Sequence, residues 1–141
     1  MSKSGPIVII EDDRDDKEIF EEVTRDIGIK NEIIWFSDPD EAYIFLKETS
    51  KAPFLIFSDI NLPGRTGLEI KKKIDDDVQL RSKSIPFVFF STTANMPDID
   101  YAYKNLTVQG FFKKLNNYND MKMLLDNIYT YWMNCKHPNT E

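Results

Sequence analysis

Five short, continuous apolar runs recur along this chain, and the segments between them carry the spacing of amphipathic helices. The runs are PIVII at 6–10, EIIWF at 32–36, FLIF at 54–57, IPFVFF at 85–90 and GFF at 110–112. Unbroken apolar runs indicate strands that are buried on both faces, as in a parallel sheet covered by helices. Their alternation with helices predicts an α/β fold: a doubly wound, five-stranded parallel sheet of order 2-1-3-4-5, with five helices on its two faces.

Each predicted helix has an apolar stripe at spacings of three and four residues. The stripes are Ile19, Phe20, Val23 and Ile27; Ala42, Phe45 and Leu46; Leu68, Ile70 and Ile74; Ile99, Ala102, Tyr103 and Leu106; and Met121, Leu124, Leu125, Ile128 and Trp132. Gly28 is placed to end the first helix, and Asp38 with Pro39 to begin the second. The acidic run at 75–77 and the polar residues after it are expected to form a solvated loop.

The length of the chain predicts one domain, because 141 residues are enough for a single core and too few for two ordinary ones. We assign this domain to residues 5–134. Residues 1–4 and 135–141 are expected to be flexible tails, and His137, in the second tail, is not expected to be a ligand.

The charge and hydropathy of the chain restrict its partners. Eighteen basic and twenty-four acidic side chains leave a formal charge of -6, which disfavours nucleic acid and anionic lipid. The longest uncharged run, SIPFVFFSTTANMP, is shorter than the ~18 residues that suggest a membrane span. The amino-terminal residues contain no apolar stretch typical of a signal peptide, and the lone Cys135 cannot form an internal disulfide. These features predict a cytoplasmic protein that does not bind a membrane.

Polar and charged side chains follow four of the predicted strands. They are Glu11, Asp12 and Asp13 after the first, Ser58 and Asp59 after the third, Ser91 and Thr92 after the fourth, and Lys113 and Lys114 after the fifth. Carboxyl ends of parallel strands meet at one edge of the sheet, where doubly wound folds bind ligands. Carboxylates ~4 Å apart repel by roughly 4 kcal/mol at an effective dielectric of about 20, so this cluster requires a cation. Mg²⁺ suits such oxygens, and a metal, a lysine, a hydroxyl and a spare aspartate suit phosphoryl transfer to that aspartate.

Four motifs in this order resemble the receiver domain of two-component response regulators. They are VIIEDD, FSDINLPGRTGLE, FFST and GFFKK, and the resemblance covers about residues 5 to 134. It implies that Asp59 accepts phosphate, and that Glu11 and Asp12 hold Mg²⁺, for which Mn²⁺ is a possible substitute. Asn61 matches the position whose backbone carbonyl completes the metal shell.

The resemblance also implies contacts to the phosphoryl group and a switch. Ser91 matches the hydroxyl that moves to the phosphoryl group, the Thr92 amide lies alongside, and Lys114 matches the lysine of the site. Phe111 matches an aromatic side chain that swings inward on activation. The implied protein is a stand-alone signalling switch or relay and not an enzyme with an external substrate. A histidine kinase or phosphotransfer protein would phosphorylate it, and an unknown target would bind the face around helix four, strand five and helix five.

Three residues depart from the family pattern. Leu115 stands where a proline after a cis bond is usual; a cis bond before a non-proline residue costs ~2.5 to 4 kcal/mol, so this loop is either trans or strained. Lys113 leaves open which lysine points into the site, although the spacing from Gly110 favours Lys114. Thr92 takes a place that a smaller residue often fills.

Other interpretations of the same residues remain. Asp13, Asp15 and Asp16 can simply cap the next helix and complement its dipole, although Asp13 could also add charge around the metal. Tyr129, Tyr131 and Trp132 either cover a sheet edge or form a partner surface. Among other functions, an aspartyl-phosphate phosphatase of the haloacid dehalogenase kind needs an acid where Asn61 stands. A flavodoxin-like carrier needs a phosphate loop where the acids stand. A degenerate receiver that acts as an unphosphorylated scaffold is disfavoured by the intact set of Glu11, Asp12, Asp59, Ser91 and Lys114.

Overall fold

Five parallel strands form the central layer of the structure, a computed structural model that describes residues 2–93 and 95–138. The strands are β1 (Ile7–Ile10), β2 (Ile33–Phe36), β3 (Leu55–Ser58), β4 (Phe87–Ser91) and β5 (Gly110–Lys113). Their order is β2-β1-β3-β4-β5, and every neighbouring pair is parallel. β1, β3 and β4 are buried along their whole length. The predicted fold class and strand order are therefore confirmed.

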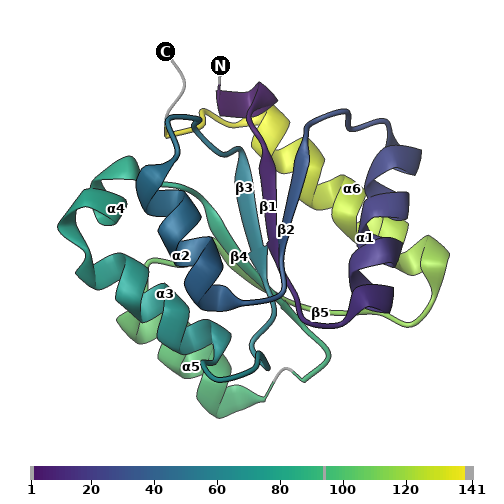
Figure 1. Cartoon of the computed structure of the whole chain (residues 1–141). Coiled ribbons are helices and arrows are strands. Elements are labelled where there is room, and N and C mark those ends of the chain that lie inside the picture. Colours follow the sequence, from purple (N-terminus) through teal and green to yellow (C-terminus); the bar gives the residue numbers. More distant parts are fainter. Residues whose placement is uncertain (1, 94, 139–141) are drawn as a thin grey trace.

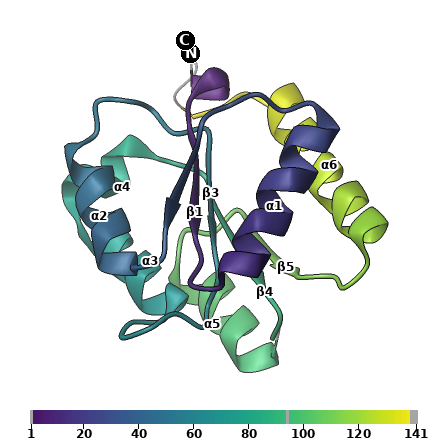
Figure 2. The ribbon, with the colours of Figure 1, turned by 45° about the vertical axis from the view of Figure 1, so that its right-hand side comes forward.

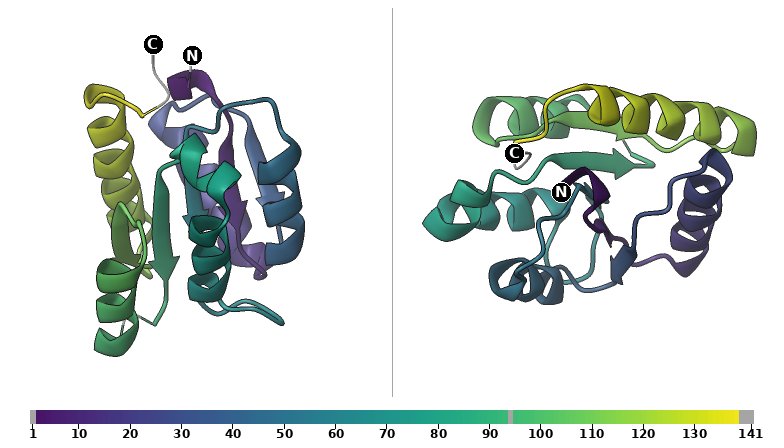
Figure 3. Two further views of the ribbon diagram at one scale, coloured as in Figure 1. Left: turned by 90° about the vertical axis from the view of Figure 1, so that its left-hand side faces the viewer. Right: turned by 90° about the horizontal axis from the view of Figure 1, so that it is seen from above.

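Helices cover both faces of this sheet (Figures 1 and 3). They are α1 (Arg14–Ile27), α2 (Pro39–Glu48), α3 (Gly67–Asp76), α4 (Val78–Lys83), α5 (Met96–Asn105) and α6 (Tyr118–Asn134), and a short 3₁₀ helix spans Ser2–Ser4. α1 and α6 pack on one face, where Phe20, Phe57 and Leu125 belong to one core cluster. α2, α3, α4 and α5 pack on the other face, where Ile56, Ile70 and Phe89 belong to a second cluster.

One helix was not expected from the sequence. Residues 78–83 were assigned to a polar loop, but they form α4, because Asp77 accepts a hydrogen bond from Leu80 N–H at 3.1 Å and Leu80 is buried. The predicted fourth and fifth helices are consequently α5 and α6. The proposed output face around helix four, strand five and helix five corresponds to α5, β5 and α6.

Two local features fix the carboxyl end of the sheet. Asp13 caps α1, since its Oδ1 accepts from Asp15 N–H at 2.8 Å and from Asp16 N–H at 3.1 Å, and this confirms the capping interpretation of Asp13. Gly67 begins α3 directly against the end of β3. A Cβ at Gly67 would lie 2.1 Å from the Asp59 carbonyl oxygen, so only glycine allows this close approach.

At the other end of the sheet, two polar groups are buried that the sequence suggested would be solvated. Asp75 belongs to α3, is 8% exposed and pairs with Lys71, so the acidic run at 75–77 is not wholly a solvated loop. His137 is 2% exposed, and its Nε2 lies 2.7 Å from the Phe54 carbonyl oxygen, which differs from the expected flexible tail. Burial of these two side chains is tolerated because each has a hydrogen-bonding partner.

Among the residues that the structure describes, no helix combines the length and the hydropathy that crossing a membrane would require.

Candidate functional site

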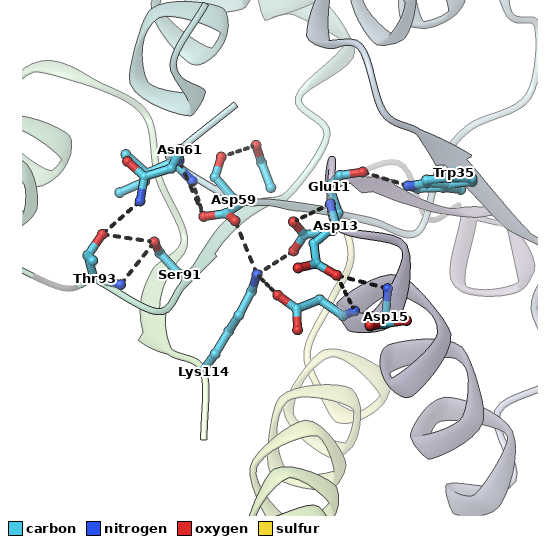
Figure 4. Close-up of polar contacts among 12 residues, drawn as sticks. Glu11, Asp13, Asp15, Trp35, Asp59, Asn61, Ser91, Thr93 and Lys114 are labelled. Carbon is cyan, nitrogen blue, oxygen red and sulfur yellow. Dashed lines mark hydrogen bonds and ion pairs between the residues drawn. The ribbon is translucent and has the colours of Figure 1, made fainter. Parts of the chain in front are cut away.

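Three acids meet at the carboxyl end of the sheet, and Figure 4 labels two of them, Glu11 and Asp59. Glu11 directly follows β1, Asp12 lies next to it, and Asp59 directly follows β3, which pairs with β1. One carboxylate oxygen from each of the three lies within 4.8 Å of the others. Glu11 and Asp59 are buried, and Asp12 is exposed, so the cluster opens to solvent on the Asp12 side.

Lys114 points into this cluster from the end of β5. Its Nζ forms an ion pair with Glu11, lies 3.1 Å from Asp59 Oδ2 and lies 3.0 Å from Asp16 Oδ2. Lys113 is exposed, so the question left open by the sequence is decided in favour of Lys114. The peptide bond between Lys114 and Leu115 is trans, as are all peptide bonds among the described residues.

Burial and the surplus of acids together set the protonation of the site. Burial raises the pKa of Glu11 to about 7; Asp59 adds to this effect, and Lys114 opposes it. Burial alone would lower the pKa of Lys114, but Glu11, Asp59 and Asp16 together hold it above its usual range. The lysine is therefore a fixed cation, but one ammonium faces three carboxylates. The site carries excess negative charge that a divalent cation would neutralise.

The backbone of the next loop orients the Asp59 carboxylate. Asp59 Oδ1 accepts from Ile60 N–H at 2.6 Å and from Asn61 N–H at 3.3 Å, whereas Oδ2 faces Lys114. The Asn61 side chain points away from Asp59, and its Nδ2 donates to Thr93 Oγ1 at 2.9 Å. Asp59 consequently presents its two oxygens in fixed and different directions.

The last residue of β4 and the residues that follow it lie near Asn61, which contacts Thr93. Ser91 is fully buried, and its Oγ accepts a hydrogen bond from Thr93 N–H at 3.3 Å. Thr92 is exposed and lines a cavity of about 80 Å³ that the acids share with apolar side chains of α1 and α6. Phe111 does not join this group: it is half-buried and its ring centroid lies 5.7 Å from that of Phe89, within the core on the α3 and α5 side.

Three contacts in this region were not predicted from the sequence. Asp16 was expected only in the first turn of α1, but its Oδ2 also lies 3.0 Å from Lys114 Nζ. Thr93 connects Ser91 to Asn61. Trp35 donates from Nε1 to the Glu11 carbonyl oxygen at 2.7 Å. None of the three contacts leaves a periodic signal in the sequence, because each joins segments that lie far apart along the chain.

The acid set fits a divalent cation with a preference for oxygen. Glu11, Asp12 and Asp59 supply only carboxylate oxygens, at separations that one ion can bridge. Mg²⁺ is bound in proteins by one or a few carboxylates together with waters, and Mn²⁺ accepts the same ligands. The open Asp12 side leaves room for such waters.

Comparisons with known proteins agree with one another. The family model described as the response regulator receiver domain matches residues 7–126. The chain is 31% identical over 132 residues to response regulator Rcp1 of Synechocystis sp., a match that covers 90% of this chain and 88% of that protein.

Solved structures of response regulators also resemble this chain. The phosphorylated cyanobacterial phytochrome response regulator RcpA superimposes with a TM-score of 0.84 at 27% identity, over 95% of this chain and 98% of that one. The Mn²⁺-bound form of Rcp1 superimposes with a TM-score of 0.81 at 29% identity, over 94% of this chain and 98% of that one.

Proposed function

The chain belongs to the response regulator receiver domain family, whose members act in phosphorylation-based signalling, and on this premise we propose a Mg²⁺-dependent switch or relay that is phosphorylated on Asp59. The observation that carries the proposal is the convergence of Glu11, Asp12, Asp59 and Lys114 at one edge of the sheet. The phosphoryl donor would be a histidine kinase or a phosphotransfer protein. The reaction would take place in the cytoplasm.

The proposed chemistry uses Asp59 as a nucleophile. One Asp59 oxygen would form the new bond to phosphorus as the bond from phosphorus to the donor's imidazole nitrogen, or to the oxygen of acetyl phosphate, breaks. Lys114, which already lies 3.1 Å from Asp59 Oδ2, would neutralise a phosphoryl oxygen. The Ser91 hydroxyl and the Thr92 amide would donate to the other oxygens. No external substrate would be turned over.

The proposed cation site consists of Glu11, Asp12, Asp59 and the Asn61 backbone carbonyl. A bound Mg²⁺ would supply positive charge next to the transferring phosphoryl group. The acidic cluster supports this assignment, and so does the Mn²⁺-bound form of Rcp1. The three residues that face Lys114 explain why a second cation is needed, because one ammonium cannot balance them.

The proposed readout is a change on the face of α5, β5 and α6. Ser91 ends β4 and precedes α5, so a movement of its hydroxyl toward phosphate would shift the start of α5. Phe111 lies on β5 next to this region and would move inward. A downstream protein would then bind the altered face.

Chemical phosphorylation tests the central claim. The protein is incubated with Mg²⁺ and acetyl phosphate, and mass spectrometry is expected to find one added phosphate that hydroxylamine removes, since an acyl phosphate reacts with it. Asp59→Asn should abolish the adduct. Asp100→Asn, which alters an exposed acid of α5, is the matched control and should label normally. An unlabelled wild-type protein, or a labelled Asp59→Asn variant, would contradict the proposal.

A thermal shift experiment tests the cation site separately. A ligand that binds only the folded state stabilises it by about 2.7 kcal/mol at 100 times its Kd, so Mg²⁺ should raise the melting temperature of the wild type. Asp12→Ala should remove this increase. Asp13→Ala removes a neighbouring acid that caps α1 and is not one of the proposed ligands, so it should lower the starting stability and keep the Mg²⁺ effect. An equal Mg²⁺ effect in Asp12→Ala would show that the ligand assignment is wrong.

A further inference from the structure

Trp35, on the edge strand β2, contacts the acid loop although it contributes no ligand to the site (Figure 4). Its side chain is half-buried, and its indole Nε1–H donates to the Glu11 carbonyl oxygen at 2.7 Å. The Glu11 N–H donates in turn to the carbonyl oxygen of Phe36 at 3.0 Å. Two consecutive residues of β2 therefore hold both backbone polar groups of Glu11.

The face of the same indole ring contacts the start of α1. Lys17 Nζ lies 4.8 Å from the Trp35 ring centroid, a cation–π geometry, and Lys17 N–H donates to the Asp13 carbonyl oxygen at 3.0 Å. The loop 11–13 is thus held by Trp35 at its first residue and, through Lys17, at its last. Asp12 lies between these two points.

This arrangement matters because the loop supplies two of the three carboxylates of the cation site. Mg²⁺ requires near-octahedral geometry at short distances, so small shifts of a ligand weaken its binding. The Asp12 side chain is exposed, and its direction depends on the backbone of the loop. Groups that orient metal ligands through hydrogen bonds commonly change metal affinity by about 10- to 100-fold when they are removed.

We propose that Trp35 is a positioning residue of the cation site: its indole N–H fixes the Glu11 backbone, and so keeps the Glu11 and Asp12 carboxylates within reach of Asp59. The inference rests on the proposed function, because it requires that the acids bind a cation. It adds a residue of β2 to a cation site whose proposed ligands follow β1 and β3.

The test compares two tryptophan substitutions. Trp35→Phe keeps an aromatic ring for Lys17 and removes the N–H donor. Trp132→Phe is the matched control. It makes the same change near the C-terminal end of α6, where Trp132 belongs to the core and not to the acid site. Calorimetric titration of each protein with Mg²⁺ is expected to show about a 10-fold increase of Kd in Trp35→Phe and no change in Trp132→Phe. The melting temperature of each metal-free variant is measured alongside.

Phosphorylation kinetics and fluorescence give further readouts. At limiting Mg²⁺, labelling of Trp35→Phe by acetyl phosphate should be slower than that of wild type, and excess Mg²⁺ should restore the rate. In Trp132→Phe, Trp35 is the remaining tryptophan of the chain's two, so its emission should change on titration with Mg²⁺. Lys17→Met removes the ammonium but leaves the hydrogen bond, and it should not weaken Mg²⁺ binding.

The outcomes separate this inference from the function on which it rests. If Trp35→Phe binds Mg²⁺ as the wild type does and only its melting temperature falls, Trp35 is merely a packing residue and the inference is wrong, while the proposed function stands. If Lys17→Met weakens binding and Trp35→Phe does not, the ring contact and not the N–H is responsible, and the assignment is also overturned. A wild-type protein that does not bind Mg²⁺ contradicts both proposals.

Discussion

Two lysines, one at each end of the sheet, pair with buried carboxylates, and they have different surroundings. Lys71 pairs with one carboxylate, Asp75, at 2.8 Å, and also donates to Thr107 Oγ1 at 3.0 Å. Asp75 further accepts from Thr107 N–H at 2.9 Å and from the Thr107 hydroxyl at 2.6 Å. At the other end, Lys114 is shared among three carboxylates. One cluster is balanced in charge and the other is not.

The difference in charge balance is the difference expected between a structural ion pair and a cation-binding site. Burial alone would raise the pKa of Asp75, but the hydrogen bonds from Lys71 and Thr107 hold it below its ordinary value. The opposite result holds at Glu11, where burial raises the pKa despite the nearby ammonium. The Lys71–Asp75 pair is balanced and joins α3 to the loop before β5. A cluster with surplus acids gains stability when a cation is added or when negative charge is removed.

The largest expected effect on stability comes from breaking the ion pair between Lys71 and Asp75. Asp75→Ala leaves the Lys71 ammonium buried without its carboxylate, and should reduce the free energy of unfolding by about 3 kcal/mol. Urea denaturation measures this loss. Asp76→Ala removes the adjacent, exposed acid that pairs with Lys72 and should have little effect. Similar losses in both variants would mean that burial does not decide the contribution of the Lys71 pair.

Removing an acid from the cluster around Lys114 should raise the free energy of unfolding instead of lowering it. Without metal, Asp59→Asn should raise the free energy of unfolding by about 1 kcal/mol, a fraction of the repulsion between unit charges that lie a few ångströms apart. Denaturation in the presence of a chelator measures the change, and Asp126→Asn, an exposed acid of α6, provides the control. A loss of stability in Asp59→Asn would mean that Asp59 is a structural acid like Asp75.

A smaller effect should appear in the pH dependence of stability. The pKa of Glu11 is raised from 4.5 to about 7 in the folded protein, so the folded state retains a proton that the unfolded state has lost. The contribution of Glu11 to stability is therefore complete below pH 4.5 and is lost as the pH rises through 7.

Glu11→Gln in chelator should flatten the decline of stability across this interval, as measured by urea denaturation at a series of pH values. Asp75 should contribute no slope there, because an acid with a lowered pKa loses its contribution only below its unfolded pKa of about 3.9. Glu48→Gln is an exposed control. An unchanged slope in Glu11→Gln would mean that burial does not keep Glu11 protonated.

Most of the fold could be predicted from the sequence, because the buried strands are continuous apolar runs and the helices between them have regular stripes. The positions of Glu11, Asp59 and Lys114 followed from the rule that parallel strands end at one edge. Their roles stay predictions. α4 could not be predicted, since it is short and only Leu80 among its six residues is buried.

The buried polar groups could not be predicted for a different reason. A second partner of Asp75, Thr107, lies 32 residues away, and the Phe54 carbonyl oxygen that His137 contacts lies 83 residues away. Neither partner leaves a periodic signal in the sequence. Trp35 is similar, because its hydrogen bond goes to a backbone atom of Glu11 and any residue at position 11 would offer the same atom.

The two ends of the described chain lie together, at the end of the sheet opposite the acids (Figures 1 and 2). Lys3 Nζ donates to the Met133 carbonyl oxygen at 2.8 Å, which joins the first turn to the last helix. This placement suits protein engineering, since close surface termini favour circular permutation and domain insertion. A short linker could join the ends, and new termini could be opened at the exposed Ser50 and Lys51. Such a permutant would carry a fused reporter without covering the acid cluster.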